Sequence, residues 1–139
     1  MKNIIFVGEF IGSALLVMAI VGSGIMAESL TNDTAVMLLA NAVATGAALY
    51  FLIVSISDIS GAHFNPFVTL AMYLSKKIKS QLLPVYFTAQ ILGCLTGVML
   101  ANFFFDYSLI ELSSKSRSGI NVFVSEIIAT FGLIFIIFR

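Results

Sequence analysis

The chain has little charge, and this scarcity decides its class. Only 10% of its 139 residues are charged whereas 60% are hydrophobic, and the mean hydropathy is +1.08. Soluble domains carry charge on about a quarter of their residues, so the composition indicates a membrane protein. The single cysteine, Cys94, excludes a disulfide within the chain. The sequence has one histidine and no metal-ligand cluster, catalytic triad or phosphate-binding loop. We therefore expect neither an enzyme nor a cofactor or metal site.

The few charged residues are separated by long apolar windows. A membrane-spanning helix needs roughly 20 apolar residues, within a range of about 17–25. Four windows are long enough, at about residues 4–26, 35–57, 82–105 and 119–138. These windows predict an all-α membrane protein with four transmembrane helices, in one domain over residues 1–139.

A further apolar stretch, about residues 58–75, is shorter and interrupted by Gly61 and Pro66. Its helical part, about 66–75, would rise roughly 15 Å, half of the ~30 Å hydrocarbon core. Asn65 is a good N-cap, and proline is tolerated at the first helical position. Irregular backbone at membrane depth has to be buried in protein or line a cavity. We therefore expect a re-entrant loop and half-helix at a pore or binding site. The alternative is a surface helix lying in the interface.

Basic residues predict the orientation in the cell membrane. A cytoplasmic N-terminus places five basic residues inside and two, Lys115 and Arg117, outside. The five are Lys2, Lys76, Lys77, Lys79 and Arg139. The short lysine cluster at 76–79 acts here as a topology signal. Without a larger basic patch, the expected partner is the lipid bilayer and not nucleic acid.

Two glutamates, Glu9 and Glu126, interrupt the first and fourth windows. Ionisable groups inside a membrane are costly and usually face the interior of the bundle. Each could carry protons, or each could accept hydrogen bonds from backbone N–H groups that the broken segment leaves unpaired. We favour the structural role, because residues 58–66 supply such donors.

Four motifs in order along the chain resemble those of the major intrinsic protein family, the aquaporins and aquaglyceroporins. They are Glu9-Phe10-Ile11-Gly12-Ser13, Ser60-Gly61-Ala62-His63-Phe64-Asn65-Pro66, Ala89-Gln90-Ile91-Leu92-Gly93 and Ser125-Glu126-Ile127-Ile128-Ala129-Thr130-Phe131. Together they cover essentially the whole chain, and the loop motif is the most specific. The residues around Thr45 resemble bacterial members more than animal ones.

The resemblance implies a channel for passive transport of water or small neutral solutes such as glycerol. In the family, two half-helices meet at the bilayer centre, and the capping asparagines donate to the passing solute. Asn65 would be one of these donors, and carbonyl groups of the residues from Gly61 to Phe64, including Ala62 and His63, would form a ladder of acceptors. Glu9 and Glu126 would brace the re-entrant loops. A homo-oligomer, a tetramer in the family, is implied for the completed protein.

The chain departs from the family pattern in three ways. Phe67 replaces the alanine of the Asn-Pro-Ala motif, where its ring is expected to narrow the midplane or push the half-helices apart. Thr45 takes the place, twenty residues before Asn65, of a filter residue that is often phenylalanine in strict water channels. It is expected either to widen the filter or to pack against a neighbouring helix and bond the carbonyl one turn back. The family has six spans, whereas four are predicted here, so we expect an incomplete bundle.

These departures lead to the prediction of an N-terminal part of a channel that does not conduct alone: a truncated or split gene product, or a fragment. The alternative is a non-conducting membrane subunit that associates with or modulates a full-length channel. A proton-coupled transporter that uses Glu9 or Glu126 is a third possibility, against which the loop motif argues.

Overall fold

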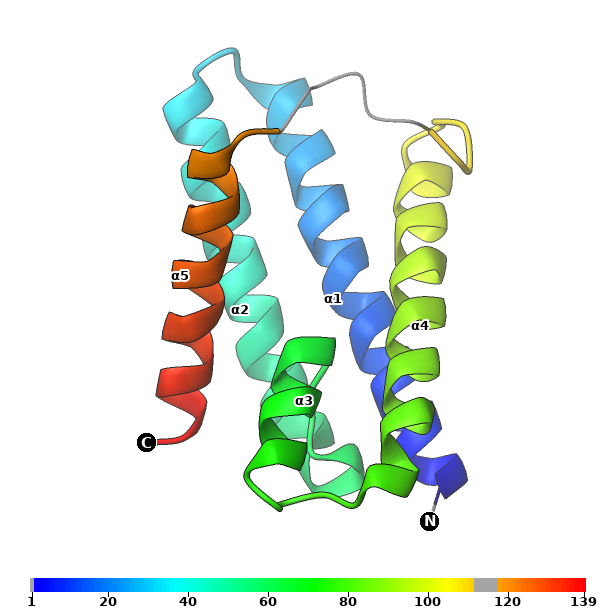
Figure 1. Ribbon diagram of the computed structural model, residues 1–139. Helices are drawn as coiled ribbons and strands as arrows, with labels where there is room; N and C mark the ends of the chain where they lie inside the picture. Colours follow the sequence, from blue (N-terminus) through cyan, green and yellow to red (C-terminus); the bar gives the residue numbers. More distant parts are fainter. Residues whose placement is uncertain (1, 112–117) are drawn as a thin grey trace.

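The computed structural model describes residues 2–111 and 118–139, and in these residues it contains five α-helices, one 3₁₀ turn and no strand. The helices form an upright bundle with both termini at the same end (Figure 1). The elements are α1 Lys2–Leu30, α2 Thr34–Ser60, α3 Pro66–Leu74, η1 Ser80–Leu82, α4 Leu83–Phe104 and α5 Ile120–Ile137.

Four of the helices, α1, α2, α4 and α5, are long and apolar enough to cross a membrane. Helices α1 and α2 continue past the predicted apolar windows at both ends, whereas α4 and α5 end one residue inside theirs. Asp33 caps α2 by accepting hydrogen bonds from the amides of Ala35 and Val36 at 2.8 and 3.3 Å. The predicted all-α membrane fold, with four spanning helices and one short helix, is confirmed.

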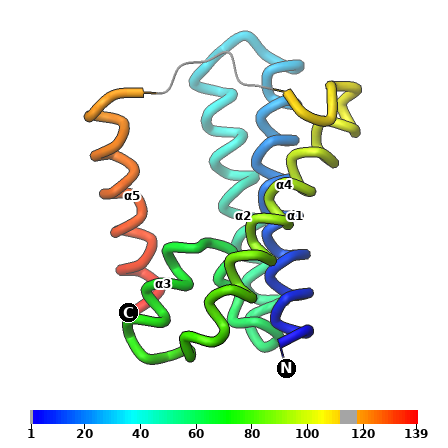
Figure 2. Tube along the Cα trace, turned by 45° about the vertical axis from the view of Figure 1, so that its right-hand side comes forward, coloured from blue at the N-terminus to red at the C-terminus, as the bar shows by residue number. Residues whose placement is uncertain are grey.

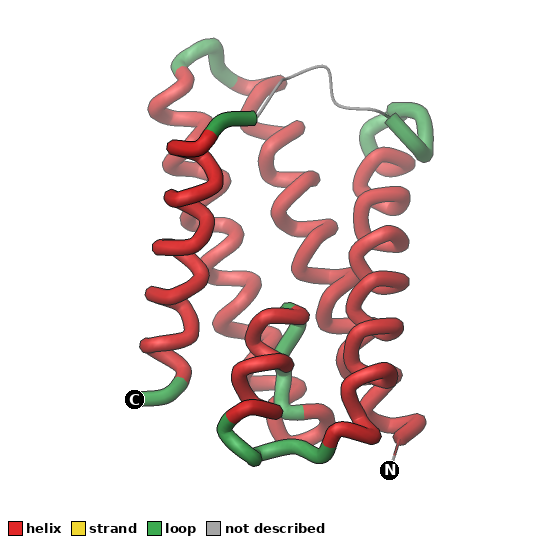
Figure 3. The backbone as a smooth tube through the Cα atoms, viewed as in Figure 1, coloured by secondary structure: helices red, strands yellow, loops and turns green. Residues whose placement is uncertain are grey.

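The short helix α3 has nine residues, which at about 1.5 Å each is roughly half the thickness of the hydrocarbon core. It starts near mid-height and runs back to the end of the bundle from which its loop came (Figures 1 and 3). Gly61 ends α2 with a φ of 90°, and its amide donates to the Ser57 carbonyl. Asn65 then caps α3, with Pro66 in the first turn. The segment is therefore re-entrant, as predicted.

Helices α1 and α4 cross closely because Gly93 and Gly97 face α1. A β-carbon on Gly93 would lie 2.5 Å from the Phe10 carbonyl oxygen, and one on Gly97 only 2.3 Å from the Ala14 carbonyl oxygen. Small residues four apart commonly permit such contact between membrane helices. This crossing places α4 beside both α1 and the half-helix.

Helix α5 lies at one edge of the bundle (Figure 2) and contacts α3. None of its described residues is buried. At its C-terminal end the Lys77 ammonium lies 4.4 Å from the centre of the Phe138 ring. The molecule therefore has a closely packed side, formed by α1, α4 and the re-entrant segment, and a loosely packed side at α5.

Candidate pore and its buried polar network

The loop between α2 and α3 contains most of the predicted pore residues and has an unusual backbone. Gly61, Ala62 and Phe64 have φ values of 90°, 51° and 48°. For residues other than glycine, a left-handed conformation costs on the order of 1–3 kcal/mol and persists only where surrounding contacts impose it. Ala62 and Phe64 are both buried and pack with Ile56. The main constraint comes from a polar cluster beneath the loop.

The centre of this cluster is the carboxylate of Glu9, which is 0% exposed. Its Oε1 accepts hydrogen bonds from the Ser60 hydroxyl at 2.7 Å and the His63 amide at 3.0 Å. Its Oε2 accepts from the Phe64 amide and from the Gln90 side chain, both at 2.8 Å. Four donors thus satisfy the two oxygen atoms of this carboxyl group, two on each oxygen. This geometry matches an acceptor for broken backbone and not a proton carrier.

A second set of bonds connects the cluster to the half-helix through Thr69, which is also 0% exposed. The Thr69 hydroxyl accepts from Gln90 Nε2 at 2.9 Å and donates to the Asn65 carbonyl at 3.1 Å. His63 Nδ1 lies 3.1 Å from the same hydroxyl oxygen. With the hydroxyl proton given to the Asn65 carbonyl, this contact is a hydrogen bond in the tautomer that is protonated at Nδ1. The α3 cap and the loop are therefore held by one network.

The loop is enclosed from the α4 side by Tyr86. Its ring stacks on His63 with centroids 4.5 Å apart and planes 16° from parallel. Its hydroxyl donates to the Ser60 carbonyl. Sequence reasoning assigned no role to Tyr86, Thr69, Gln90 or Ser60. Ser60 and Gln90 belong to two of the motifs above. Gln90 is also a polar residue within an apolar span, where such groups usually face the interior.

A cavity of about 320 Å³ lies between α2, the loop, α3 and α5. Asn65 lies at its wall, where Oδ1 accepts from the Phe67 amide at 2.8 Å. Among the described residues, Asn65 Nδ2 has no hydrogen-bond partner, and neither do the carbonyl groups of residues 61–64. Most other lining side chains are apolar, namely Leu16, Leu49, Ile53, Val68, Leu133, Ile136 and Ile137.

The predicted residues Gly61 and Pro66, at the two ends of the loop, do not line this cavity. Three further predicted residues lie outside both the cavity lining and the polar network. Phe67 is 63% exposed, and its ring is not part of the lining. Thr45 is half-buried on α2 and also does not line the cavity. Its buried hydroxyl has no partner within the described residues, so it does not bond the carbonyl one turn back. Glu126 is exposed on α5, and no described residue bonds its carboxylate. Their functional roles stay predictions.

Comparison with known proteins agrees with this architecture. The family model described as "Major intrinsic protein" matches residues 2–139. The aquaglyceroporin AqpS of Rhizobium meliloti (strain 1021) is 44% identical over 92% of this chain and 55% of its own length. Aquaporin NIP3-1 of Arabidopsis thaliana is 34% identical over 94% of the chain and 43% of its own. The probable aquaporin TIP2-2 of rice (Oryza sativa subsp. japonica) is 34% identical over 96% and 55%.

The chain spans about half the length of the curated relatives it matches. The match to the family model is nevertheless continuous through all five α-helices and the re-entrant loop. The matched residues include the motifs at Glu9, Asn65 and Gln90. The chain therefore belongs to the major intrinsic protein family.

Proposed function

We propose that this chain forms part of the wall of a membrane channel for passive transport of water or small neutral solutes. The observation that carries the proposal is that the two polar atoms of the Asn65 side chain have different surroundings. One side-chain atom, Oδ1, caps α3, while Nδ2 stays unpaired among the described residues at the cavity wall. A donor held in this way can bind the oxygen atom of a passing water or polyol.

The remaining wall suits the same solutes. The unpaired carbonyl groups of residues 62–64 are acceptors, and the side chains around them are mainly apolar. An apolar wall does not compete for hydrogen bonds, so a solute exchanges its hydration for a few fixed polar groups. The positive end of the α3 dipole lies at the same place and disfavours cations.

The Glu9 cluster has a structural role in this proposal. It holds Ala62 and Phe64 in left-handed conformations that would otherwise be costly, and it thereby orients the loop. Glu126 is proposed to brace a second re-entrant segment in a completed channel. Pro66 starts α3 in its present direction, and His63 anchors the loop through Thr69 and Tyr86.

Solutes of glycerol size are proposed in addition to water. The relative AqpS bears the name aquaglyceroporin, and Thr45 is smaller than the phenylalanine that would narrow a filter. We also propose a cell-membrane location, a cytoplasmic N-terminus and assembly of completed copies into a homo-oligomer, a tetramer by family resemblance. The excess of basic residues at the end that holds the N-terminus supports this orientation.

We propose further that the chain does not conduct well alone, because it contributes one half-helix and one asparagine donor to the pore. Stopped-flow light scattering on vesicles with the purified chain should show water permeability close to that of empty vesicles. High permeability with a low activation energy would contradict this and favour a self-assembled pore.

The channel itself is tested in a chimera that continues the chain with the remaining part of AqpS. The chimera should pass water and glycerol. Asn65→Asp keeps the cap but replaces the donor by an acceptor, so the variant should fold like the parent and leak cations. An Asp variant with unchanged ion rejection would remove Asn65 from the pore. A well-folded chimera that passes neither solute would favour the non-conducting subunit.

A further inference from the structure

A second cavity, of about 330 Å³, lies between the first turns of α1 and α4, at the end of the bundle that holds the N-terminus. Its volume is within the ~300–1,000 Å³ typical of ligand sites. It shares no lining residue with the candidate pore. The lining residues are Lys2, Asn3 and Phe6 of α1 and Pro84, Val85 and Thr88 of α4.

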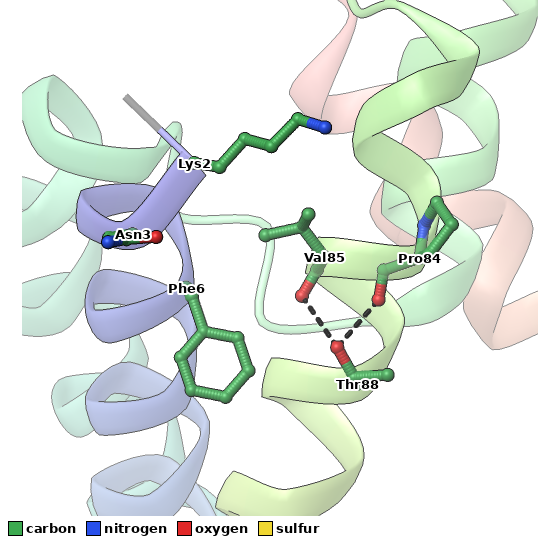
Figure 4. Close-up of a pocket in the computed structure, with 6 residues that line it drawn as sticks. All are labelled: Lys2, Asn3, Phe6, Pro84, Val85 and Thr88. Carbon is green, nitrogen blue, oxygen red and sulfur yellow. Dashed lines mark hydrogen bonds between the residues drawn. The ribbon is translucent and has the colours of Figure 1, made fainter.

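The polar and apolar groups of this groove are separated along its length. Figure 4 shows the Lys2 side chain extending from α1 toward α4 above Val85, with the Phe6 ring farther along the groove. Within the described residues, neither the Lys2 ammonium nor the Asn3 amide has a hydrogen-bond or ion-pair partner. The Thr88 hydroxyl, in contrast, donates to its own helix, at 2.6 Å to the Pro84 carbonyl oxygen. The free donors are therefore concentrated near the terminus and the apolar surface lies deeper.

The charge of the surrounding end favours an anion. Among the described residues, two carboxylates lie toward this end, Asp58 in the last turn of α2 and the buried Glu9, which bonds Ser60. They stand against five basic residues, Lys2, Lys76, Lys77, Lys79 and Arg139. The opposite end has Glu28, Asp33, Asp106 and Glu111, and none of its described residues is basic. The groove is thus an amphipathic site at the positive membrane surface of the protein.

We propose that this groove binds an anionic phospholipid. The headgroup phosphate would bind the Lys2 ammonium, which extends toward α4, and an acyl chain would run along Phe6 and Val85. Basic pockets between transmembrane helices on the cytoplasmic side bind anionic lipid headgroups. A soluble anion would use Lys2 but would leave the apolar part of the groove empty.

Native mass spectrometry of the purified chain tests the proposal in detergent doped with phosphatidylglycerol or, separately, with phosphatidylcholine. The chain should retain phosphatidylglycerol preferentially. A lysine near an anionic lipid contributes about 1 kcal/mol, so Lys2→Gln should weaken retention about five-fold. Lys79→Gln is the matched control, because it removes an exposed charge at the same end but outside the groove. It should retain the lipid like the parent.

A second pair of variants leaves every charge in place. Thr88→Phe fills the apolar part of the groove and should reduce retention, and it keeps the proposal testable if Lys2→Gln does not fold. Thr96→Phe is its control, since Thr96 lies on the same helix and makes the same type of bond, to the Leu92 carbonyl at 2.8 Å.

Three results would overturn the site. The first is equal retention of the two lipids, and the second is equal loss in Lys2→Gln and Lys79→Gln. The third is equally tight binding of glycerol 1-phosphate, which would identify a site for soluble phosphate.

Discussion

Glu9 and Glu126 are chemically identical and both lie in apolar helices, yet their surroundings are opposite. Glu9 is fully buried between α1, α4 and the re-entrant loop and accepts four hydrogen bonds. Glu126 is exposed on α5, with no partner among the described residues. The difference follows from the backbone nearby. The loop at 62–64 leaves N–H groups without helical acceptors, and Glu9 bonds two of them. No described backbone N–H bonds Glu126.

The contrast between Glu9 and Glu126 indicates when a carboxylate in an apolar helix stabilises the fold. Burying an unpaired carboxylate is costly, and so is leaving backbone amides unpaired away from water. At Glu9 the two costs cancel, because each group satisfies the other. The same pairing links elements that are far apart in the sequence, so the close packing of α1, α4 and α3 depends on it.

The largest effect is expected from Glu9→Leu, which leaves the donors of Ser60, His63, Phe64 and Gln90 unsatisfied. At roughly 1 kcal/mol or more for each donor, the variant should lose about 4 kcal/mol of stability and most of its folded yield. Glu9→Gln keeps one acceptor oxygen and should be intermediate. Thermal unfolding and size-exclusion yield in detergent measure both effects.

Glu126→Leu is the matched control for this change. It removes an exposed carboxylate without a described partner, so the stability of this chain should stay within about 0.5 kcal/mol of the parent. A loss at Glu126 as large as that at Glu9 would show that the two sides of the bundle do not differ in the way proposed.

Glycine-to-alanine substitutions should change the stability by a smaller amount. The change should be a loss on the closely packed side, at α4, and a gain on the loosely packed side, at α5. Gly97→Ala places a methyl group 2.3 Å from the Ala14 carbonyl oxygen, so α1 and α4 must separate, at a cost of about 1–3 kcal/mol. A β-carbon on Gly132 of α5 meets nothing within 4 Å. Gly132→Ala should therefore stabilise the chain by about 0.5–1 kcal/mol through helix propensity. Melting temperatures that shift in the same direction would contradict this.

The smallest effect is expected at the contact between Lys77 and Phe138. This contact joins the turn between α3 and η1 to the C-terminal end of α5. A cation–π contact at an exposed site contributes about 0.5–1 kcal/mol. A double-mutant cycle with Lys77→Gln and Phe138→Leu should return a coupling free energy of about that size. Phe138→Tyr keeps an aromatic ring and should behave like the parent. Fully additive single changes would mean that this contact does not hold α5.

Much of the fold was predictable because it depends on local properties of the chain. The apolar windows between charged residues predicted four spans, since window length and hydrocarbon thickness are compared directly. The Asn65-Pro66 pair predicted the start of the half-helix, because capping and the fixed φ of proline act within one turn. The observed α3, Pro66–Leu74, ends one residue before the predicted limit.

The site was predictable only in part. The sequence singled out Glu9 and Glu126 as acceptors and residues 58–66 as the broken backbone, because an acid and a backbone break are unusual in apolar segments. It did not distinguish the two glutamates. It did not identify Thr69 or Tyr86, since a threonine one turn into a helix and a tyrosine in a span are ordinary in any membrane protein. The positions of Thr45 and Phe67 outside the cavity lining also depend on helix rotation, which apolar composition does not specify.

The sequence by itself therefore determined which segments are helical, which of them span, and where the chain turns back. These outcomes follow from hydrophobicity, capping and the conformational limits of proline, all of which act over a few residues. Only the tertiary structure decided that donors 51, 54, 55 and 81 residues away in the chain converge on one carboxylate. That convergence requires both the close α1–α4 crossing and the left-handed loop. The crossing brings the Gln90 amide to Glu9, and the loop brings the His63 and Phe64 amides.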